Sequence, residues 1–85
     1  MNNAYTQQNM QQIILAAIQE VAPEIEQDDI DMDEDIREEC DLDSMDFLNY
    51  LIALKKSTAV SIPESDYSQV NTCNKMLSYL SEKLA

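Results

Sequence analysis

The 85-residue sequence contains no glycine, two prolines and a single phenylalanine. β-Sandwiches and β-barrels need turn glycines and strands rich in aromatic and β-branched residues, so this composition disfavours them. The apolar fraction of 45% and the charged fraction of 26% are ordinary for a folded domain and argue against disorder. We therefore expect residues 1–85 to form one small all-α domain, a four-helix bundle of three main helices and a short one.

Histidine is also absent. Without it the chain cannot assemble a Ser-His-Asp or Cys-His catalytic set. The two cysteines, Cys40 and Cys73, lie far apart and have no CxxC spacing of the kind found in zinc sites. These absences indicate that the protein is not an enzyme and binds no zinc.

A long apolar run and a signal peptide are missing as well. The longest apolar run, Ile13 to Ile18, is too short to cross a bilayer, and the N-terminal residues show no targeting pattern. Two cysteines without a disulfide pattern fit a reducing compartment. We therefore expect a cytoplasmic monomer that makes no membrane contact.

Positive charge is scarce, with 5 lysines and arginines against 17 acids and a net charge of −12. Residues 20–46 hold 14 of the acids and one base, Arg37, so this segment alone carries −13. Such a field repels phosphate, which disfavours nucleic acid and anionic membranes as partners. It attracts proteins with basic surfaces, although a solvated acidic loop is the simpler interpretation.

The dense carboxylates do not have the spacing of a calcium-binding EF-hand loop. With Asp31 at position 1, the glycine of position 6 and the glutamate of position 12 would be Ile36 and Leu42. A start at Asp29 fails in the same way. The sequence therefore predicts no specific metal site.

Apolar periodicity predicts the helices. They are expected over roughly Thr6 to Val21, from Asp43 or Ser44 to about Lys56, over a short turn from Asp66 to Val70, and from just after Thr72, as the cap, to about Leu84. The candidate caps of the first helix are Asn2, Asn3 and Thr6. For the second long helix we expect a buried face made of Met45, Leu48, Leu51, Ile52 and Leu54.

Two segments are expected to lack long helices. From Glu24 to Asp43 no helical stripe persists, which predicts a long acidic loop pinned to the core by single apolar anchors such as Ile30 and Ile36. The segment from Ser57 to Ser65 is expected to be a linker.

Ser44 stands at the start of the second long helix, directly after Asp43. A serine at this position is commonly a helix cap. Alternatively, its hydroxyl is a substrate to which a phosphate group is attached, because the positive end of a helix dipole stabilises phosphate.

Asp43-Ser44-Met45 resembles the Asp-Ser-Leu attachment motif of the acyl carrier proteins, small acidic four-helix proteins that bear 4′-phosphopantetheine. The similarity covers about Ile13 to Leu80 and includes, in order, Ile30, Ile36, Asp46, the apolar run Leu48 to Leu54, Ile62-Pro63-Glu64 and Tyr79.

The resemblance implies that Ser44 receives the 4′-phosphopantetheine arm from coenzyme A through a separate phosphopantetheinyl transferase. The thiol of the arm would then carry acyl groups as thioesters for enzymes of fatty-acid, lipid or polyketide pathways. Asp43 would belong to the cofactor site, and the positions that meet the transferase and acyl-processing enzymes would be Asp41, Met45, Asp46, Asn49, Lys55 and Lys56. The acyl chain would be sheltered by Leu48, Leu51, Ile52 and the loop anchors, while Cys40 and Cys73 match apolar positions and would be buried and unreactive.

The chain departs from the family pattern in two places. Asp41 replaces the glycine usual before the serine, and aspartate tolerates a positive φ better than most residues. Asn49, Lys55 and Lys56 stand at positions that are usually acidic, which implies a specialised carrier rather than a housekeeping one. The alternatives are a D-alanyl or other aminoacyl carrier, and a non-carrier acidic interaction module in which Ser44 is a cap.

Overall fold

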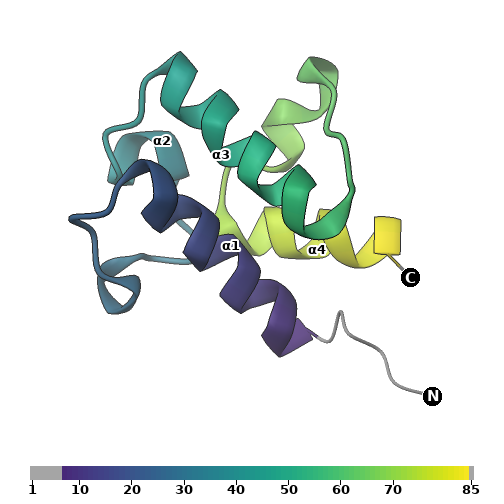
Figure 1. Cartoon of the computed structure of the whole chain (residues 1–85), viewed down its shortest axis with the longest axis horizontal. Helices are drawn as coiled ribbons and strands as arrows, with labels where there is room; N and C mark the ends of the chain where they lie inside the picture. The colour runs from purple at the N-terminus through teal and green to yellow at the C-terminus, as the bar shows by residue number, and fades with distance from the viewer. Residues whose placement is uncertain (1–6, 85) are drawn as a thin grey trace.

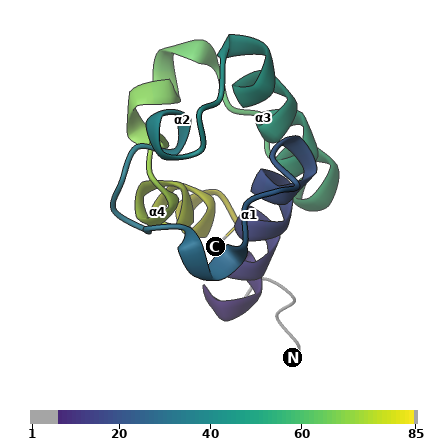
Figure 2. The same ribbon diagram turned by 90° about the vertical axis from the view of Figure 1, so that its left-hand side faces the viewer.

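A computed structural model of the chain describes residues 7–84. In chain order its elements are α1 (Gln7–Val21), the 3-10 turn η1 (Gln27–Asp29), α2 (Ile36–Glu39), α3 (Ser44–Thr58), the 3-10 segment η2 (Glu64–Gln69) and α4 (Cys73–Leu84). The long helices α1, α3 and α4 surround one core, and α2 lies near the first turn of α3 (Figures 1 and 2). None of the helices in residues 7–84 has the length and apolar character needed to span a bilayer.

The long helices have nearly the expected bounds. The start of α4 is as predicted, and α1 ends at Val21 as predicted, while Asn2, Asn3 and Thr6 lie outside the described residues. α3 continues past Lys56 to Thr58, whose buried hydroxyl donates to the carbonyl of Leu54 at 2.7 Å. The linker is correspondingly shorter than expected, and η2 begins at Glu64 rather than Asp66.

The acidic segment between α1 and α3, which we expected to be a long loop, also contains the short elements η1 and α2. The apolar anchors are confirmed, since the buried residues of the segment include Ile30, Ile36, Cys40 and Leu42. A helix of four residues is too short to show an apolar stripe. It is instead stabilised by a cap, because the carboxylate of Asp35 accepts hydrogen bonds from the backbone N–H groups of Arg37 and Glu38.

The acidic segment is bound to the start of α4 by a contact that we call the loop tie, formed by residues 32–36 and 71–74. The backbone N–H of Ile36 donates to the carbonyl of Asn71 at 2.8 Å, and that of Asn74 donates to the carbonyl of Met32 at 3.0 Å. The side-chain amide of Asn74 also donates to Asp33 at 2.6 Å. The loop tie fixes where α2 lies relative to the core.

The buried face of α3 differs from the predicted one. Its buried side chains are Phe47, Tyr50, Leu51, Ala53, Leu54 and Thr58. The prediction is right for Leu51 and Leu54 and wrong for three residues that are exposed, namely Met45 (64%), Leu48 (41%) and Ile52 (50%).

The reason is that α3 carries two apolar stripes on neighbouring faces. The rings of Phe47 and Tyr50, with centroids 5.7 Å apart, fill the core because aromatic side chains bury the most apolar surface. The other stripe, which we call the outer stripe (Met45, Leu48 and Ile52), is left on the surface.

Two residues occupy the left-handed backbone region although the chain has no glycine: Asp41, with a φ of 54°, and Ala59, with a φ of 62°. Ala59 is the C-cap that follows α3, and its N–H donates to the carbonyl of Lys55 at 2.7 Å. A side chain in this region clashes with the backbone at a cost of roughly 1–2 kcal/mol, which glycine avoids.

We therefore predict that Ala59→Gly raises the free energy of unfolding in urea by about 0.5–1 kcal/mol, despite the greater entropy of glycine in the unfolded chain. The matched control is Ala16→Gly, at an exposed position inside α1, which should lower it by about 1 kcal/mol. A loss of stability in both variants would contradict the left-handed conformation of Ala59.

Candidate functional site

Ser44 is the first residue of α3, but it is not the helix cap. Asp43 is the cap, since its carboxylate accepts a hydrogen bond from the N–H of Asp46 at 2.8 Å. The carboxylate of Asp46 in turn accepts from the N–H of Asp43 at 3.4 Å, which completes a capping box. The serine side chain is therefore exposed and is not required to satisfy the backbone of the helix.

Arg37 reaches Ser44 from α2. Its Nη2 donates to Ser44 Oγ at 3.4 Å, and its guanidinium carbon lies 5.6 Å from the centroid of the Phe47 ring. The second contact is a cation–π interaction, which helps to hold the guanidinium over the start of α3. Arg37 is not among the site residues expected from the sequence, although its position as the one base in residues 20–46 was a signal for it.

The turn between α2 and α3 brings these two residues together. The N–H of Leu42 donates to the carbonyl of Arg37 at 2.8 Å, which is the long hydrogen bond of a Schellman motif. In that motif the residue before Leu42 adopts the left-handed conformation, and Asp41 does so with a φ of 54°. The expectation that aspartate can replace the usual glycine here is confirmed.

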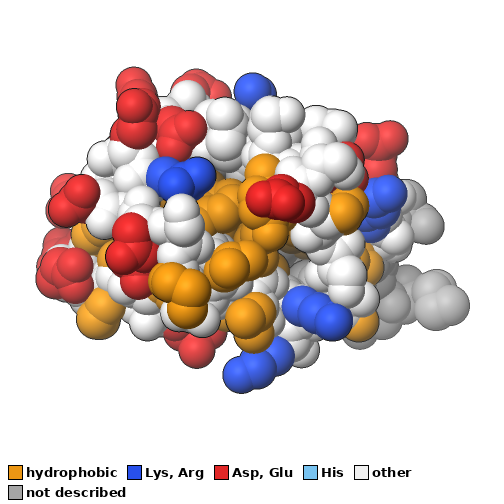
Figure 3. Space-filling model, turned by 90° about the horizontal axis from the view of Figure 1, so that it is seen from above, with side chains coloured by type: hydrophobic (Ala, Val, Ile, Leu, Met, Phe, Trp, Pro, Cys, Tyr) orange, Lys and Arg blue, Asp and Glu red, His pale blue; other side chains and the backbone are white. Residues whose placement is uncertain are grey.

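A hollow of about 370 Å³ opens beside Ser44 between α3 and η2. Its lining is Arg37, Ser44, Phe47, Leu48, Glu64 and Tyr67. A second hollow of about 200 Å³ shares Leu48 and Tyr67 with the first and continues along α3. Apolar side chains gather on this face, and acidic ones crowd towards the end where α3 begins (Figure 3). The two hollows form a path from the serine over an apolar surface.

The residues expected to shelter an acyl chain divide between two places. Leu48, Leu51 and Ile52 line the second hollow together with Val60 and Ile62, so that part of the expectation fits the structure. The loop anchors Ile30, Ile36 and Leu42 pack in the core instead.

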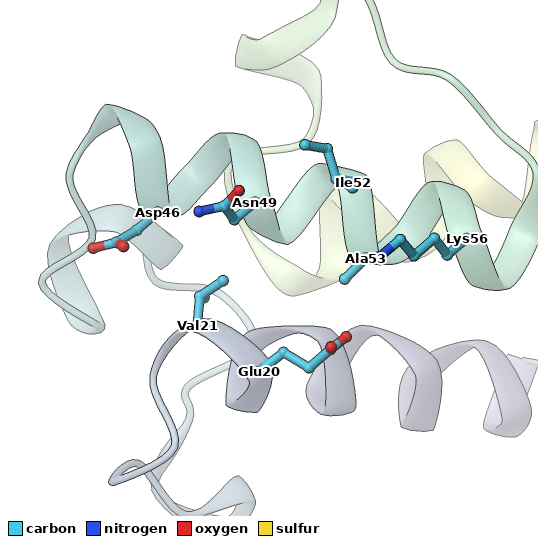
Figure 4. Close-up of a pocket in the computed structure, with 7 residues that line it drawn as sticks. All are labelled: Glu20, Val21, Asp46, Asn49, Ile52, Ala53 and Lys56. Carbon is cyan, nitrogen blue, oxygen red and sulfur yellow. The ribbon is translucent and has the colours of Figure 1, made fainter.

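The positions expected to meet partner enzymes all lie on or beside α3, and most are exposed. Asp46, Asn49 and Lys56 line a hollow of about 390 Å³ between α1 and α3, with Glu20 on its opposite wall (Figure 4). Lys55 lines the apolar hollow on the other side of the helix. Asp41 and Met45 are exposed at the serine end.

Both cysteines are free and buried, as expected. Burial raises the pKa of Cys73 to about 12, with smaller contributions from Cys40, Glu39 and Asp31. Burial also raises the pKa of Cys40, assisted by the carboxylates of Glu39 and Glu24. Both therefore remain neutral thiols at physiological pH, a form that is a poor nucleophile. Within residues 7–84 no three or more cysteine or carboxylate side chains are grouped so as to hold a metal ion.

A comparison with known protein families shows which family the chain belongs to. Residues 12–80 match the family model described as the phosphopantetheine attachment site. The chain belongs to this family. Members carry 4′-phosphopantetheine as a covalent group and are carriers rather than enzymes, so the protein is a phosphopantetheine-bearing carrier. None of the curated proteins compared with the sequence matches it.

The surroundings of Ser44 fit the group that this family carries. A phosphate near the serine would meet the carboxylates of Asp41 and Asp43, which oppose it, and the guanidinium of Arg37, which offsets them. The apolar path along α3 and η2 offers a surface for the rest of the arm and its cargo.

Proposed function

We propose that Ser44 is the residue to which 4′-phosphopantetheine is attached and that the arm carries acyl groups as thioesters. The observation that carries this proposal is the division of roles at the start of α3. Asp43 caps the helix, and the neighbouring Ser44 presents its hydroxyl to solvent beside a cationic side chain and an apolar hollow.

Attachment requires a second protein. Ser44 Oγ forms a bond to the phosphorus of the phosphopantetheine half of coenzyme A, the bond from that phosphorus to the nucleotide half breaks, and the serine proton passes to a base. The chain has no histidine to act as that base. A phosphopantetheinyl transferase with a basic surface and Mg²⁺ supplies these groups, and the charge of −13 on residues 20–46 attracts it.

The lining of the path favours an acyl cargo. Leu48, Ile52, Val60 and Ile62 give it an apolar surface, on which each buried methylene contributes about 0.8 kcal/mol. In the second hollow the ammonium group of an aminoacyl cargo would lose hydration without gaining a partner of opposite charge, because the charged residue that lines this hollow is Lys55. We therefore favour an acyl carrier over a D-alanyl carrier.

The outer stripe of α3 is the face that we propose for partner enzymes. Its apolar side chains have acids at the serine end (Asp41, Asp43 and Asp46) and lysines at the far end (Lys55 and Lys56), with Asn49 between them. A matching enzyme has an apolar contact with basic groups at one end and acidic groups at the other. This pattern supports a specialised carrier of a dedicated lipid or polyketide pathway rather than a housekeeping carrier of fatty-acid biosynthesis.

We also propose that the protein works as a cytoplasmic monomer. Its two buried cysteines are free thiols, which fits a reducing compartment. The net charge of −12 opposes association between copies.

The proposed function predicts that the chain gains the mass of one phosphopantetheine when it is incubated with coenzyme A, Mg²⁺ and a broad-specificity transferase. Ser44→Ala should gain none, and the control Ser68→Ala, at an exposed serine of η2, should be loaded like the wild type. Intact mass spectrometry gives the result directly. No gain on the wild type would contradict the function, and an equal gain on Ser44→Ala would contradict the site.

The proposed specialisation predicts a charge effect on housekeeping enzymes. Lys55→Glu/Lys56→Glu should raise kcat/KM with a housekeeping malonyl transferase by about tenfold, because it removes repulsion at the far end of α3. The matched control, Lys75→Glu/Lys83→Glu, makes the same change of charge on α4 and should have little effect. An equal change of kcat/KM in the two double variants would contradict the specialisation. So would a wild-type chain that the housekeeping transferase already uses as efficiently as a housekeeping carrier.

A further inference from the structure

The backbone of Arg37 is held in place by hydrogen bonds at both ends of α2. Asp35 accepts a hydrogen bond from its backbone N–H at 2.9 Å, and Leu42 donates to its carbonyl at 2.8 Å, so both ends of α2 hold its backbone. The neighbouring Ile36 is fully buried at 0% exposure. From this fixed backbone the exposed side chain of Arg37 reaches α3.

Among the described residues, the hydrogen-bond and cation–π partners of the Arg37 guanidinium are both uncharged. They are the hydroxyl of Ser44, at 3.4 Å from Nη2, and the ring of Phe47, at 5.6 Å from the guanidinium carbon. The segment around it holds 14 acids, yet the guanidinium is directed at the serine. Glu64 of η2 lines the same hollow and is the acidic side chain of that lining that competes with a phosphate for the guanidinium.

We propose that Arg37 binds the phosphate of the 4′-phosphopantetheine arm and directs the root of the arm into the hollow between α3 and η2. This inference rests on the proposed attachment to Ser44. Attachment turns Ser44 Oγ into an ester oxygen of a phosphodiester, which keeps one negative charge and two free oxygens at neutral pH. The guanidinium that already donates to Oγ then donates to those oxygens, in a charge-assisted hydrogen bond with a planar group suited to phosphate.

The proposed contact between Arg37 and the phosphate sets the direction in which the arm leaves Ser44. Arg37 and Glu64 line the hollow that leads through Leu48 and Tyr67 to the apolar path. A phosphate held on the Arg37 side starts the arm inside this hollow instead of in open solvent above the acidic loop. Arg37 is thus a positioning residue for the arm and, through it, for the cargo.

The first test is a double-mutant cycle between loading and Arg37. Wild type and Arg37→Gln are each prepared unloaded and loaded, with loading verified by intact mass, and their melting temperatures are compared. Loading should raise the melting temperature of the wild type by about 4 °C more than that of Arg37→Gln. This difference corresponds to a solvent-exposed ion pair at the upper end of the stabilities measured for such pairs. Arg37→Lys, which keeps the charge but lacks the planar fork, should fall between them.

The matched control is Lys75→Gln, which removes one positive charge from α4. Loading should change its melting temperature as much as it changes that of the wild type. If loading shifts wild type and Arg37→Gln equally, the proposal for Arg37 is wrong while the proposed function stands. If the wild type gains no mass at all, the proposed function fails first.

A second readout uses the wild type alone and does not depend on the folding or loading of a variant. In ¹H–¹⁵N spectra the Nε–H resonance of Arg37 should shift on loading, and the ³¹P resonance of the arm should move as added salt weakens the contact. An Arg37 resonance that is unchanged by loading, together with a ³¹P resonance insensitive to salt, would overturn the proposal.

Discussion

The loop tie is the constraint on which the functional site depends. The first-turn N–H groups of a helix have no partner within the helix, and here two short segments that are far apart in sequence satisfy each other. Ile36, at the start of α2, donates to Asn71, and Asn74, in the first turn of α4, donates to Met32. The tie holds α2 against the core, so Arg37 projects towards Ser44 instead of following a mobile acidic loop.

α3 has two different apolar faces. The inner face places Phe47 and Tyr50 in the core and makes the helix a rigid support, with the serine on its first turn. The outer stripe leaves apolar surface in water, which contributes nothing to folding and serves contact with cargo and partners. The capping box belongs to the same arrangement, since Asp43 and Asp46 satisfy the helix start and spare the serine hydroxyl.

The sequence was sufficient for the long helices, because α1 and α4 each carry one unambiguous apolar stripe that ends at a recognisable boundary. The sequence also indicated that Asp41 could adopt a positive φ in place of the usual glycine, because aspartate tolerates this conformation better than most residues. The inner face of α3 could not be assigned from periodicity, because Phe47 and Leu48 both satisfy a helical spacing and only packing decides which is buried. Arg37 could not be assigned because its role depends on the Schellman turn and on the loop tie, whose side-chain hydrogen bond joins residues 41 positions apart.

Amide hydrogen exchange at Ile36 and Asn74 tests the role of the loop tie most directly. Both are first-turn amides, which exchange quickly unless a partner outside the helix protects them. We predict that they exchange about ten times more slowly than the amide of Met45, in the exposed first turn of α3. Exchange at Ile36 and Asn74 as fast as at Met45 would mean that the acidic segment is not held against α4 and that the fold does not position Arg37 beside Ser44.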